Sequence, residues 1–340
     1  MGYTIGIAGA SGYAGGELVR LVDAHPALDL GYLAAHSRVG DPLGLVHPQL
    51  SGGERVMAPL DPDAMSHLDL VFLALPHGAS ADPAMALLDR GVRVVDLGSD
   101  FRLDTPERYC EAYGSDHPFP DQLGAWPFGV PELFGGDLAG ADRVAVPGCY
   151  PTSVALALAP LLASGVVEPA GIVVSSMSGV SGAGRSVRAD LLFGAVAESV
   201  TAYGVLTHRH RPEMERALEA ACGENVEVTF TPHLVPMQRG LLSTCHAKST
   251  GAGDAAAVLQ AAYAGSPFVR VVPEPPHTSW VVGSNRCFLS AHADDRTGSV
   301  IVVSAIDNLL KGAAGQAVQC ANVMLGLPGA EGLPTEGWMP

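Results

Sequence analysis

The sequence predicts an α/β protein of two domains: a parallel sheet with helices on both faces, then an α+β domain with a mainly antiparallel sheet. Three observations support this fold class. A glycine-rich turn directly follows the first apolar segment, strand and helix patterns alternate through the first half, and apolar segments follow one another in the second half. The 340 residues also exceed what one hydrophobic core usually serves.

The first half reads as alternating strands and helices. A strand at 3–8 precedes the glycine turn at 9–16, and a helix at 17–24 follows and stops before Pro26. Further apolar strands are expected at 30–35, 68–75, 92–97 and 143–146. In a parallel sheet of this kind, ligands bind at the carboxyl ends of the strands.

The second half begins with a helix at 153–163 and continues mainly as strands. Those strands are expected at 171–177, 226–231, 241–247, 268–272, 280–283, 287–291 and 300–305. A helix of small residues at 309–325 and a Gly/Pro-rich surface tail at 326–340 close the chain. We expect one domain at 1–148, completed by 309–340, and a second at 149–308.

Composition limits the possible partners and location. Nineteen Lys and Arg against 35 Asp and Glu give a net charge of -16, which argues against nucleic-acid and anionic-membrane partners. The six scattered cysteines form no CxxC pair, so a reducing cytoplasm is expected. No targeting signal or membrane-spanning segment is recognised. Any anionic ligand must therefore be held by local arginines.

The glycine turn predicts a nucleotide site in a Rossmann-type domain. Gly9, Gly12 and Gly15 have the spacing GxxGxxG, a variant of the dinucleotide fingerprint. Glycines at these positions let backbone N–H groups and the N-terminus of the next helix approach a pyrophosphate. A packing turn is the alternative, and the position directly after the first strand favours the cofactor.

The end of the second strand favours NADP over NAD. NAD-binding domains carry an acidic residue there, whereas this chain has Ser37 and Arg38, and an arginine suits a 2′-phosphate. Asp29 stands at the start of that strand, at the wrong edge of the sheet for the ribose. A solvated loop charge is the plain alternative for Arg38.

Cys149 is the candidate nucleophile. It follows a buried strand and precedes a helix, between Gly148 and Pro151, where a helix N-terminus or an imidazole lowers the pKa of a thiol. The other five cysteines stand in ordinary strand, helix or loop contexts, and we expect them to be inert.

Two further segments supply polar groups. The segment 208–213 (HRHRPE) is the densest cationic cluster and offers a base; two histidines without a matching Cys/His pair elsewhere do not predict a metal site. The segment 178–185 (SGVSGAGR) is a flexible loop that can offer N–H groups and hydroxyls to a phosphate or carboxylate. Surface loops remain the plain reading of both.

Over nearly its whole length the chain resembles the type 1 N-acetyl-gamma-glutamyl-phosphate reductases. The resemblance rests on GASGYAGGE at 9–17, LALPHG at 73–78, DFR at 100–102, PGCYPT at 147–152, SGVSGAGR at 178–185, HRH at 208–210 and AIDNLLKG at 305–312. It implies a fold related to aspartate-semialdehyde dehydrogenase, with an N-terminal Rossmann domain completed by the C-terminal helix. It also implies a homodimer or homotetramer formed through the second domain.

The resemblance implies NADPH-dependent reduction of N-acetyl-L-glutamyl 5-phosphate to the 5-semialdehyde, with release of phosphate, in arginine biosynthesis. Carried over, Cys149 forms a thioester and His208 is the acid/base. The implied cofactor contacts are Gly9, Ser11, Gly12, Tyr13, Ala14, Gly15, Pro76, Gly78, Ser178, Gly182 and Asn308. The substrate phosphate and carboxylate are assigned to Arg102, Arg185 and Arg211, in an order left open, with His210 beside them.

Three other functions are compatible with these residues. Another acyl phosphate, such as an aspartyl or carrier-bound aminoadipyl phosphate, could replace the acetylated glutamyl substrate. A non-catalytic NADP-binding sensor would use the glycine turn alone, with Cys149 in the core. A thiol acyltransferase or amidohydrolase would use Cys149 and His208 without nicotinamide, which the glycine turn and Arg38 disfavour.

Overall fold

The computed structural model describes residues 2–338, so the last two residues of the expected tail lie outside the described residues. The chain divides into two compact units. The first runs to Pro147 and resumes at Ala313–Leu333; the second covers Gly148–Gly312 and resumes at Pro334. The tail from Pro334 thus packs with the second unit, although the sequence analysis grouped it with the first.

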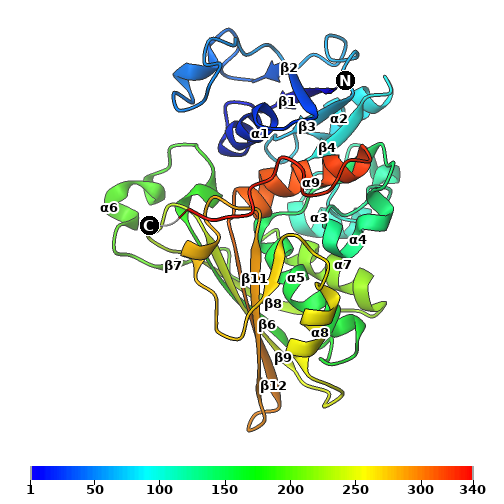
Figure 1. Ribbon diagram of the computed structural model, residues 1–340, viewed down its shortest axis with the longest axis vertical. Coiled ribbons are helices and arrows are strands. Elements are labelled where there is room, and N and C mark those ends of the chain that lie inside the picture. The colour runs from blue at the N-terminus through cyan, green and yellow to red at the C-terminus, as the bar shows by residue number, and fades with distance from the viewer. Residues whose placement is uncertain (1, 339–340) are drawn as a thin grey trace. The chain divides into compact units, whose positions relative to one another are not determined.

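Within residues 2–338, five parallel strands form the sheet of the first unit, in the order β2-β1-β3-β4-β5. This confirms the doubly wound parallel sheet predicted for the first half. Figure 1 labels β1, β2, β3 and β4 of this sheet. The strands are short; β3 is fully buried and β4 and β5 nearly so, as expected for a parallel sheet covered on both faces, whereas the edge strand β2 is partly exposed. They are β1 (Tyr3–Ala8), β2 (Leu28–Ala34), β3 (Leu70–Leu73), β4 (Arg93–Asp96) and β5 (Arg143–Ala145).

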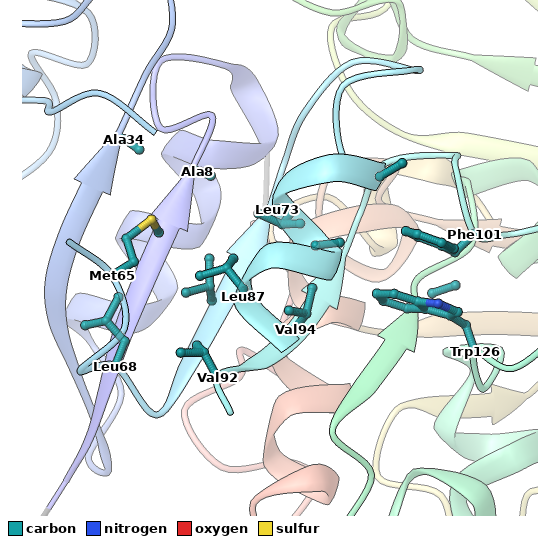
Figure 2. Packing of buried hydrophobic residues seen from close by; sticks show 14 residues of the cluster. Ala8, Ala34, Met65, Leu68, Leu73, Leu87, Val92, Val94, Phe101 and Trp126 are labelled. Atoms are coloured by element: carbon teal, nitrogen blue, oxygen red, sulfur yellow. The ribbon is translucent and has the colours of Figure 1, made fainter. Parts of the chain in front are cut away.

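Helices and a packed core hold this sheet. Helix α9 belongs to the first unit and contacts α1, α4 and β4, although it lies at the far end of the sequence. In the core, the Phe101 and Trp126 rings stack with centroids 4.1 Å apart beside Leu87 and Val94 (Figure 2). The helices are α1 (Tyr13–Asp23), α2 (Ala81–Leu88), α3 (Pro106–Tyr113), α4 (Pro131–Leu138) and α9 (Gly315–Met324).

The described part of the second unit contains a seven-stranded sheet in the order β10-β11-β12-β9-β6-β8-β7. Only the β10–β11 and β6–β8 pairs are parallel, which confirms the mainly antiparallel sheet. The strands are β6 (Ile172–Ser178), β7 (Thr201–Ala202), β8 (Val228–Leu234), β9 (Leu241–Lys248), β10 (Val269–Val271), β11 (Cys287–Asp294) and β12 (Ser299–Ile306).

Helices α5 (Cys149–Ala163), α7 (Arg211–Cys222) and α8 (Ala255–Ala262) pack on the strands of this sheet, and α6 (Phe193–Val196) is a single turn in the 181–200 segment. Strand β6 alternates buried and exposed residues, so Val173 (42% exposed) and Met177 (45% exposed) point away from the buried side. One face of the sheet is therefore covered by helices, while the other presents apolar side chains.

Several elements differ from the expectation; among them, α1 begins at Tyr13, four residues before the predicted helix at 17–24. The predicted strand at 280–283 is wrong: Thr278–Trp280 is a 3-10 turn, and Gly283 has a φ of 85°. The backbone there serves other partners, because Val282 accepts the Trp338 N–H and Gly283 donates to Asp307. The first helix of the second unit begins four residues earlier than predicted, at Cys149, since a proline is tolerated in a first turn.

The predicted final helix at 309–325 is divided. A π-helical turn covers Leu310–Ala314, and regular helix follows as α9. The boundary between the two units falls inside that turn, after Gly312. Among the helices of residues 2–338, none has the length and apolar character needed to span a membrane.

Candidate active site

Cys149 is the first residue of α5, and Gly148 is its N-cap. The helix runs for 15 residues, has no side-chain cap and no acidic residue in its first turn, so its N-terminal N–H groups and dipole favour negative charge at Cys149. The thiol forms no disulfide with another described cysteine and is partly exposed. A helix N-terminus favours the thiolate, which is the nucleophilic form of cysteine.

Glu213, in the first turn of α7, fixes the approach to this helix. Its carboxylate is fully buried, and Oε2 accepts the Gly148 N–H at 3.0 Å. Its Oε1 lies 3.9 Å from Nε2 of His210, the N-cap of α7. A buried carboxylate is thus shared between the residue before Cys149 and an imidazole.

Crowding around Cys149 explains two glycines. A Cβ at Gly148 would stand 2.5 Å from His210 Cε1 and Nε2, and a Cβ at Gly312 would stand 2.6 Å from Cys149 Cβ. Contacts this short do not occur for real Cβ atoms, so any side chain would push the imidazole or the cysteine away. His210 therefore packs edge-on against the residue that precedes Cys149.

His208 occupies a cage of aromatic rings. Its ring centroid lies 5.5 Å from those of Tyr150 and Tyr203, 5.3 Å from Phe230 and 4.8 Å from His210. Its Nδ1 accepts the His210 backbone N–H at 3.2 Å. Burial, reinforced by the neighbouring Arg209 charge, lowers the pKa of His208 to about 4.

A cavity of about 280 Å³ in the second unit brings several of these groups together. Of the predicted site residues, Cys149, His208, His210, Ser178 and Gly182 line it. Two arginines that the sequence analysis did not select, Arg188 and Arg209, also line it. The predicted Arg185 and Arg211 are not among its described lining residues; the Arg211 Nη1 donates to the Leu206 carbonyl instead.

A pair of tyrosines forms part of the same wall. The hydroxyl groups of Tyr150 and Tyr203 are 2.8 Å apart, and Tyr203 stands just after β7. Burial is the main cause that raises the pKa of Tyr150, and it also raises the pKa of Tyr203 to about 12. Both phenols therefore stay protonated and offer neutral hydroxyl groups near Cys149.

Asn308 and Asp307 anchor the 178–185 loop and the start of the final helix. The Asn308 amide donates to Ser181 Oγ at 3.0 Å and accepts the Gly240 N–H at 2.8 Å. The fully buried Asp307 pairs with Arg239 at 3.0 Å and accepts the Leu309 and Leu310 N–H groups. The AIDN segment thus holds the loop against the sheet.

The glycine turn of the first unit fits a pyrophosphate. A Cβ at Gly9 would collide with the Ala74 carbonyl, and one at Gly15 with the Gly9 carbonyl, so the fold itself requires both. Gly12, the N-cap of α1, has extended φ and ψ. A Cβ at this position would meet only the Gly9 carbonyl oxygen, at 3.4 Å. A side chain there would fill the space before an uncapped helix N-terminus, which is the space a phosphate takes.

The neighbouring predicted cofactor contacts lie along this edge. Ser11 and Ala14 are partly buried, and Tyr13 is 40% exposed. Gly9 and Ala10 donate to the Ala34 carbonyl, so the turn lies beside the end of β2.

Ser37 and Arg38 follow β2 at that same edge and are exposed; Arg38 pairs with Asp41 at 3.2 Å. Asp29 lies opposite Thr4 in the register of β1 and β2, near the other end of both strands, as expected for a residue at the start of β2. The edge beside the glycine turn therefore carries an arginine and no acidic residue of the β2 strand itself.

Asp100 organises the segment around Pro76 and Gly78. Its buried carboxylate accepts the N–H groups of Gly78, Ser80 and Ala81, and lies 3.3 Å from His77 Nδ1. Arg102 is only 8% exposed, and its Nη2 donates to the Leu97 carbonyl at 2.6 Å. This bond fixes one end of the guanidinium to the backbone, and the assignment of Arg102 to a substrate anion stays a prediction.

Four residues of this site were missed by the sequence analysis: Glu213, Tyr203, Arg188 and Arg209. Glu213 stands three residues after His210 at a helix start, a spacing that predicts contact on one helix face. The positions of Tyr203 and Arg188 depend on how the 181–206 segment folds, for which no local pattern exists. No group of three or more potential metal ligands occurs among residues 2–338.

Comparison with known families agrees with this architecture. Residues 4–141 match the family described as semialdehyde dehydrogenase, NAD binding domain, and residues 149–308 match semialdehyde dehydrogenase, dimerisation domain. Among solved structures, aspartate semialdehyde dehydrogenase II from Vibrio cholerae, complexed with ASA, has a TM-score of 0.73 at 17% identity. The match covers 96% of this chain and 99% of that chain.

Aspartate semialdehyde dehydrogenase with NADP from Candida albicans has a TM-score of 0.68 at 14% identity, over 96% of this chain and 99% of that one. These two likenesses establish the fold.

Curated relatives are much closer in sequence. The N-acetyl-gamma-glutamyl-phosphate reductases of Frankia casuarinae and Salinispora tropica are 51% and 50% identical over 100% of this chain and 100% of theirs. That of Moorella thermoacetica is 44% identical over 98% of this chain and 99% of its own. With these identities over the full length, the chain belongs to the N-acetyl-gamma-glutamyl-phosphate reductase family.

Proposed function

We propose that the protein reduces N-acetyl-L-glutamyl 5-phosphate to N-acetyl-L-glutamate 5-semialdehyde with NADPH and releases phosphate, as a step of arginine biosynthesis. The observation that carries this proposal is the position of Cys149 at an uncapped helix N-terminus, in one cavity with two imidazoles and two arginines. Family membership supports the substrate, because the curated relatives carry that name over their whole length.

The thiol solves a chemical problem. A carboxylate does not accept hydride, whereas a thioester carbonyl does. The Cys149 sulfur attacks the acyl carbon, the carbon–oxygen bond to phosphate breaks, and phosphate leaves. The N-terminus of α5 favours the thiolate and presents the Cys149 and Tyr150 N–H groups to the oxyanion; Pro151 has no N–H to add.

We assign the acid–base role to His210 rather than to His208. His210 packs against Gly148 and faces the buried Glu213 carboxylate, which favours a protonated imidazole. His210 takes the thiol proton and passes it to the departing phosphate oxygen. When the hemithioacetal collapses, its carbon–sulfur bond breaks, the aldehyde leaves and the thiolate is restored. The low pKa of His208 makes it a weak base.

Arg188 and Arg209 are our proposed anion-binding groups. Both line the cavity, and Arg188 projects from the segment that also carries Asp190, its partner at 2.5 Å. The substrate brings a phosphate and an α-carboxylate, and guanidinium groups bind either. The overall charge of -16 makes local arginines necessary for this task.

NADPH supplies the hydride when it is bound. We propose that Gly9, Gly12 and Gly15 approach its pyrophosphate and that Arg38 binds its 2′-phosphate. We also propose that the cofactor contacts further residues of both units. These are Ser11, Tyr13, Ala14, Ser37, Pro76, Gly78, Ser178, Gly182 and Asn308. The open space before Gly12 supports the first of these assignments.

We further propose that the first unit is the NADP-binding domain and that the second is the catalytic and oligomerisation domain. The uncovered face of the seven-stranded sheet, with Val173 and Met177, suits contact with a second copy in a homodimer or homotetramer. A cytoplasmic location is proposed because none of the six cysteines, all within the described residues, forms a disulfide, and a catalytic thiol needs a reducing compartment.

The direct test is phosphate-dependent reduction of NADP with N-acetyl-glutamate semialdehyde, with aspartate semialdehyde compared side by side. We expect turnover with the acetylated glutamyl compound and at least about 100-fold lower kcat/KM with the aspartyl compound.

Cys149→Ser should lower kcat about 10⁴-fold or more and leave NADPH binding intact. The exposed Cys110, changed to Ser, is the matched control and should keep kcat within about twofold. Substantial turnover by Cys149→Ser would rule out covalent catalysis.

His210→Asn should lower kcat by a factor of about 10² to 10⁴, the usual contribution of a general acid–base. Glu213→Gln should lower kcat less and displace the limb of the pH profile toward lower pH, because the carboxylate favours the protonated imidazole. Rates measured from pH 5.5 to 9 check both. If the profile of Glu213→Gln matches that of the parent protein, Glu213 does not act on His210.

Arg188→Gln should raise KM for the semialdehyde or for phosphate about 10-fold, the scale of one charge-assisted hydrogen bond. Arg185→Gln, three residues earlier and outside the cavity lining, should change each KM by less than about twofold. Steady-state kinetics in the phosphate-dependent direction separates the two KM values. A larger effect of Arg185→Gln would restore the sequence-based assignment.

A further inference from the structure

His208 is a titratable group of the cavity that the proposed mechanism leaves without a task. It lines the same cavity as Cys149, yet the acid–base role falls to His210. The HRH segment therefore places two imidazoles at one site, and their surroundings differ. His210 faces a buried carboxylate, whereas His208 faces aromatic rings and the Arg209 charge.

The hydrogen bond to Nδ1 fixes the tautomer of His208. The His210 backbone N–H donates to that nitrogen at 3.2 Å, so Nδ1 must carry its lone pair. The single proton of the neutral ring then sits on Nε2. Protonation of Nδ1 would set two N–H groups against each other and break this bond. The local geometry thus keeps His208 neutral with Nε2–H as a donor.

The groups around His208 reinforce this state. Tyr150, Tyr203, Phe230 and His210 surround the ring, and the phenols stay protonated because burial raises their pKa values. Arg209 adds a positive charge that opposes a second one on the ring, and burial acts in the same direction. Nothing in this shell except the Cys149 thiolate would favour an imidazolium.

His208 lines the cavity, and Nε2 is the ring nitrogen left for a ligand there. Within the described chain, no hydrogen bond engages Nε2, although the cage restrains the ring itself on several sides. An imidazole fixed in one tautomer, restrained by packing and left with one donor in a substrate cavity is a preorganised binding group.

We propose that His208 is a neutral hydrogen-bond donor, which gives its Nε2–H to an anionic oxygen of the bound acyl phosphate and takes no part in proton transfer. This inference rests on the proposed function for the identity of the ligand. It goes beyond that function by separating the two histidines of the HRH segment into a donor and an acid–base. Arg209, adjacent in sequence, supplies charge to the same anion.

A pair of substitutions at one position tests the proposal. A glutamine places an N–H near the Nε2 position and cannot act as a base at any working pH; a leucine of similar size has no donor. We expect His208→Gln to keep kcat/KM within about fivefold, and His208→Leu to lose about 10- to 100-fold, the range for a hydrogen bond to a charged group. The pH profile of His208→Gln should coincide in shape with that of the parent protein between pH 5.5 and 9.

The phosphate-dependent assay shows which oxygen is bound. A rise in KM for inorganic phosphate in His208→Leu identifies the phosphate, and a rise in KM for the semialdehyde, or a fall in kcat alone, identifies the acyl oxygen. Equal loss of kcat in His208→Gln and His208→Leu, or loss of a pH limb in His208→Gln, would overturn the proposal. Thermal melting and NADPH binding of both variants exclude misfolding as the cause.

A second measurement does not depend on activity. Nitrogen-15 NMR of histidine-labelled protein, with His208→Gln used to assign the signal, should show an unprotonated Nδ1 and a protonated Nε2 from pH 5.5 to 8. An imidazolium or the opposite tautomer at pH 7 would overturn the inference even if the enzyme is active. If the parent protein reduces no acyl phosphate, the proposed function fails, and the NMR result still decides the state of His208.

Discussion

The buried carboxylate of Glu213 is the constraint on which the surroundings of Cys149 depend. It accepts the Gly148 N–H at 3.0 Å and lies 3.9 Å from His210, so one side chain ties the start of α5 to the start of α7. A fully buried carboxylate is costly unless its oxygens are engaged, which makes this arrangement stiff. The position of the Cys149 sulfur at a helix N-terminus, and of an imidazole beside it, both follow from this tie.

His208 and His210 are two residues apart in the sequence, but their surroundings differ. A carboxylate lies 3.9 Å from the His210 ring, while burial, Arg209 and the backbone N–H at Nδ1 favour a neutral ring at His208. We propose that the same sequence motif delivers an acid–base and a donor to one cavity. Two arginines also line this cavity, and we propose that they allow a chain of net charge -16 to bind an anionic substrate.

Much of the fold was predictable, because hydrophobic periodicity and the positions of glycine and proline indicate its strands, helices and turns. The first strand and the glycine turn follow from local patterns, and so does the alternation that gives a parallel sheet. The early start of α5 was not predicted, since Pro151 resembles a helix break when its place in the first turn is unknown. Cys149 could be found because it stands at a strand–helix junction. Arg188 and Tyr203 could not be found, because their approach to Cys149 depends on how a long irregular segment folds. The burial of Arg102 could not be predicted either, because it results from tertiary packing.

We propose that the Cys149 sulfur becomes acylated before any hydride is transferred. The most direct measurement mixes the protein with N-acetyl-glutamyl phosphate in the absence of NADPH and records the intact mass, the modified peptide and the released phosphate. The account predicts one acetylglutamyl group per chain, attached at Cys149, with an equal amount of phosphate released and loss of the adduct when NADPH is added. Reduction of the acyl phosphate without any adduct, or an adduct on another residue, would contradict it.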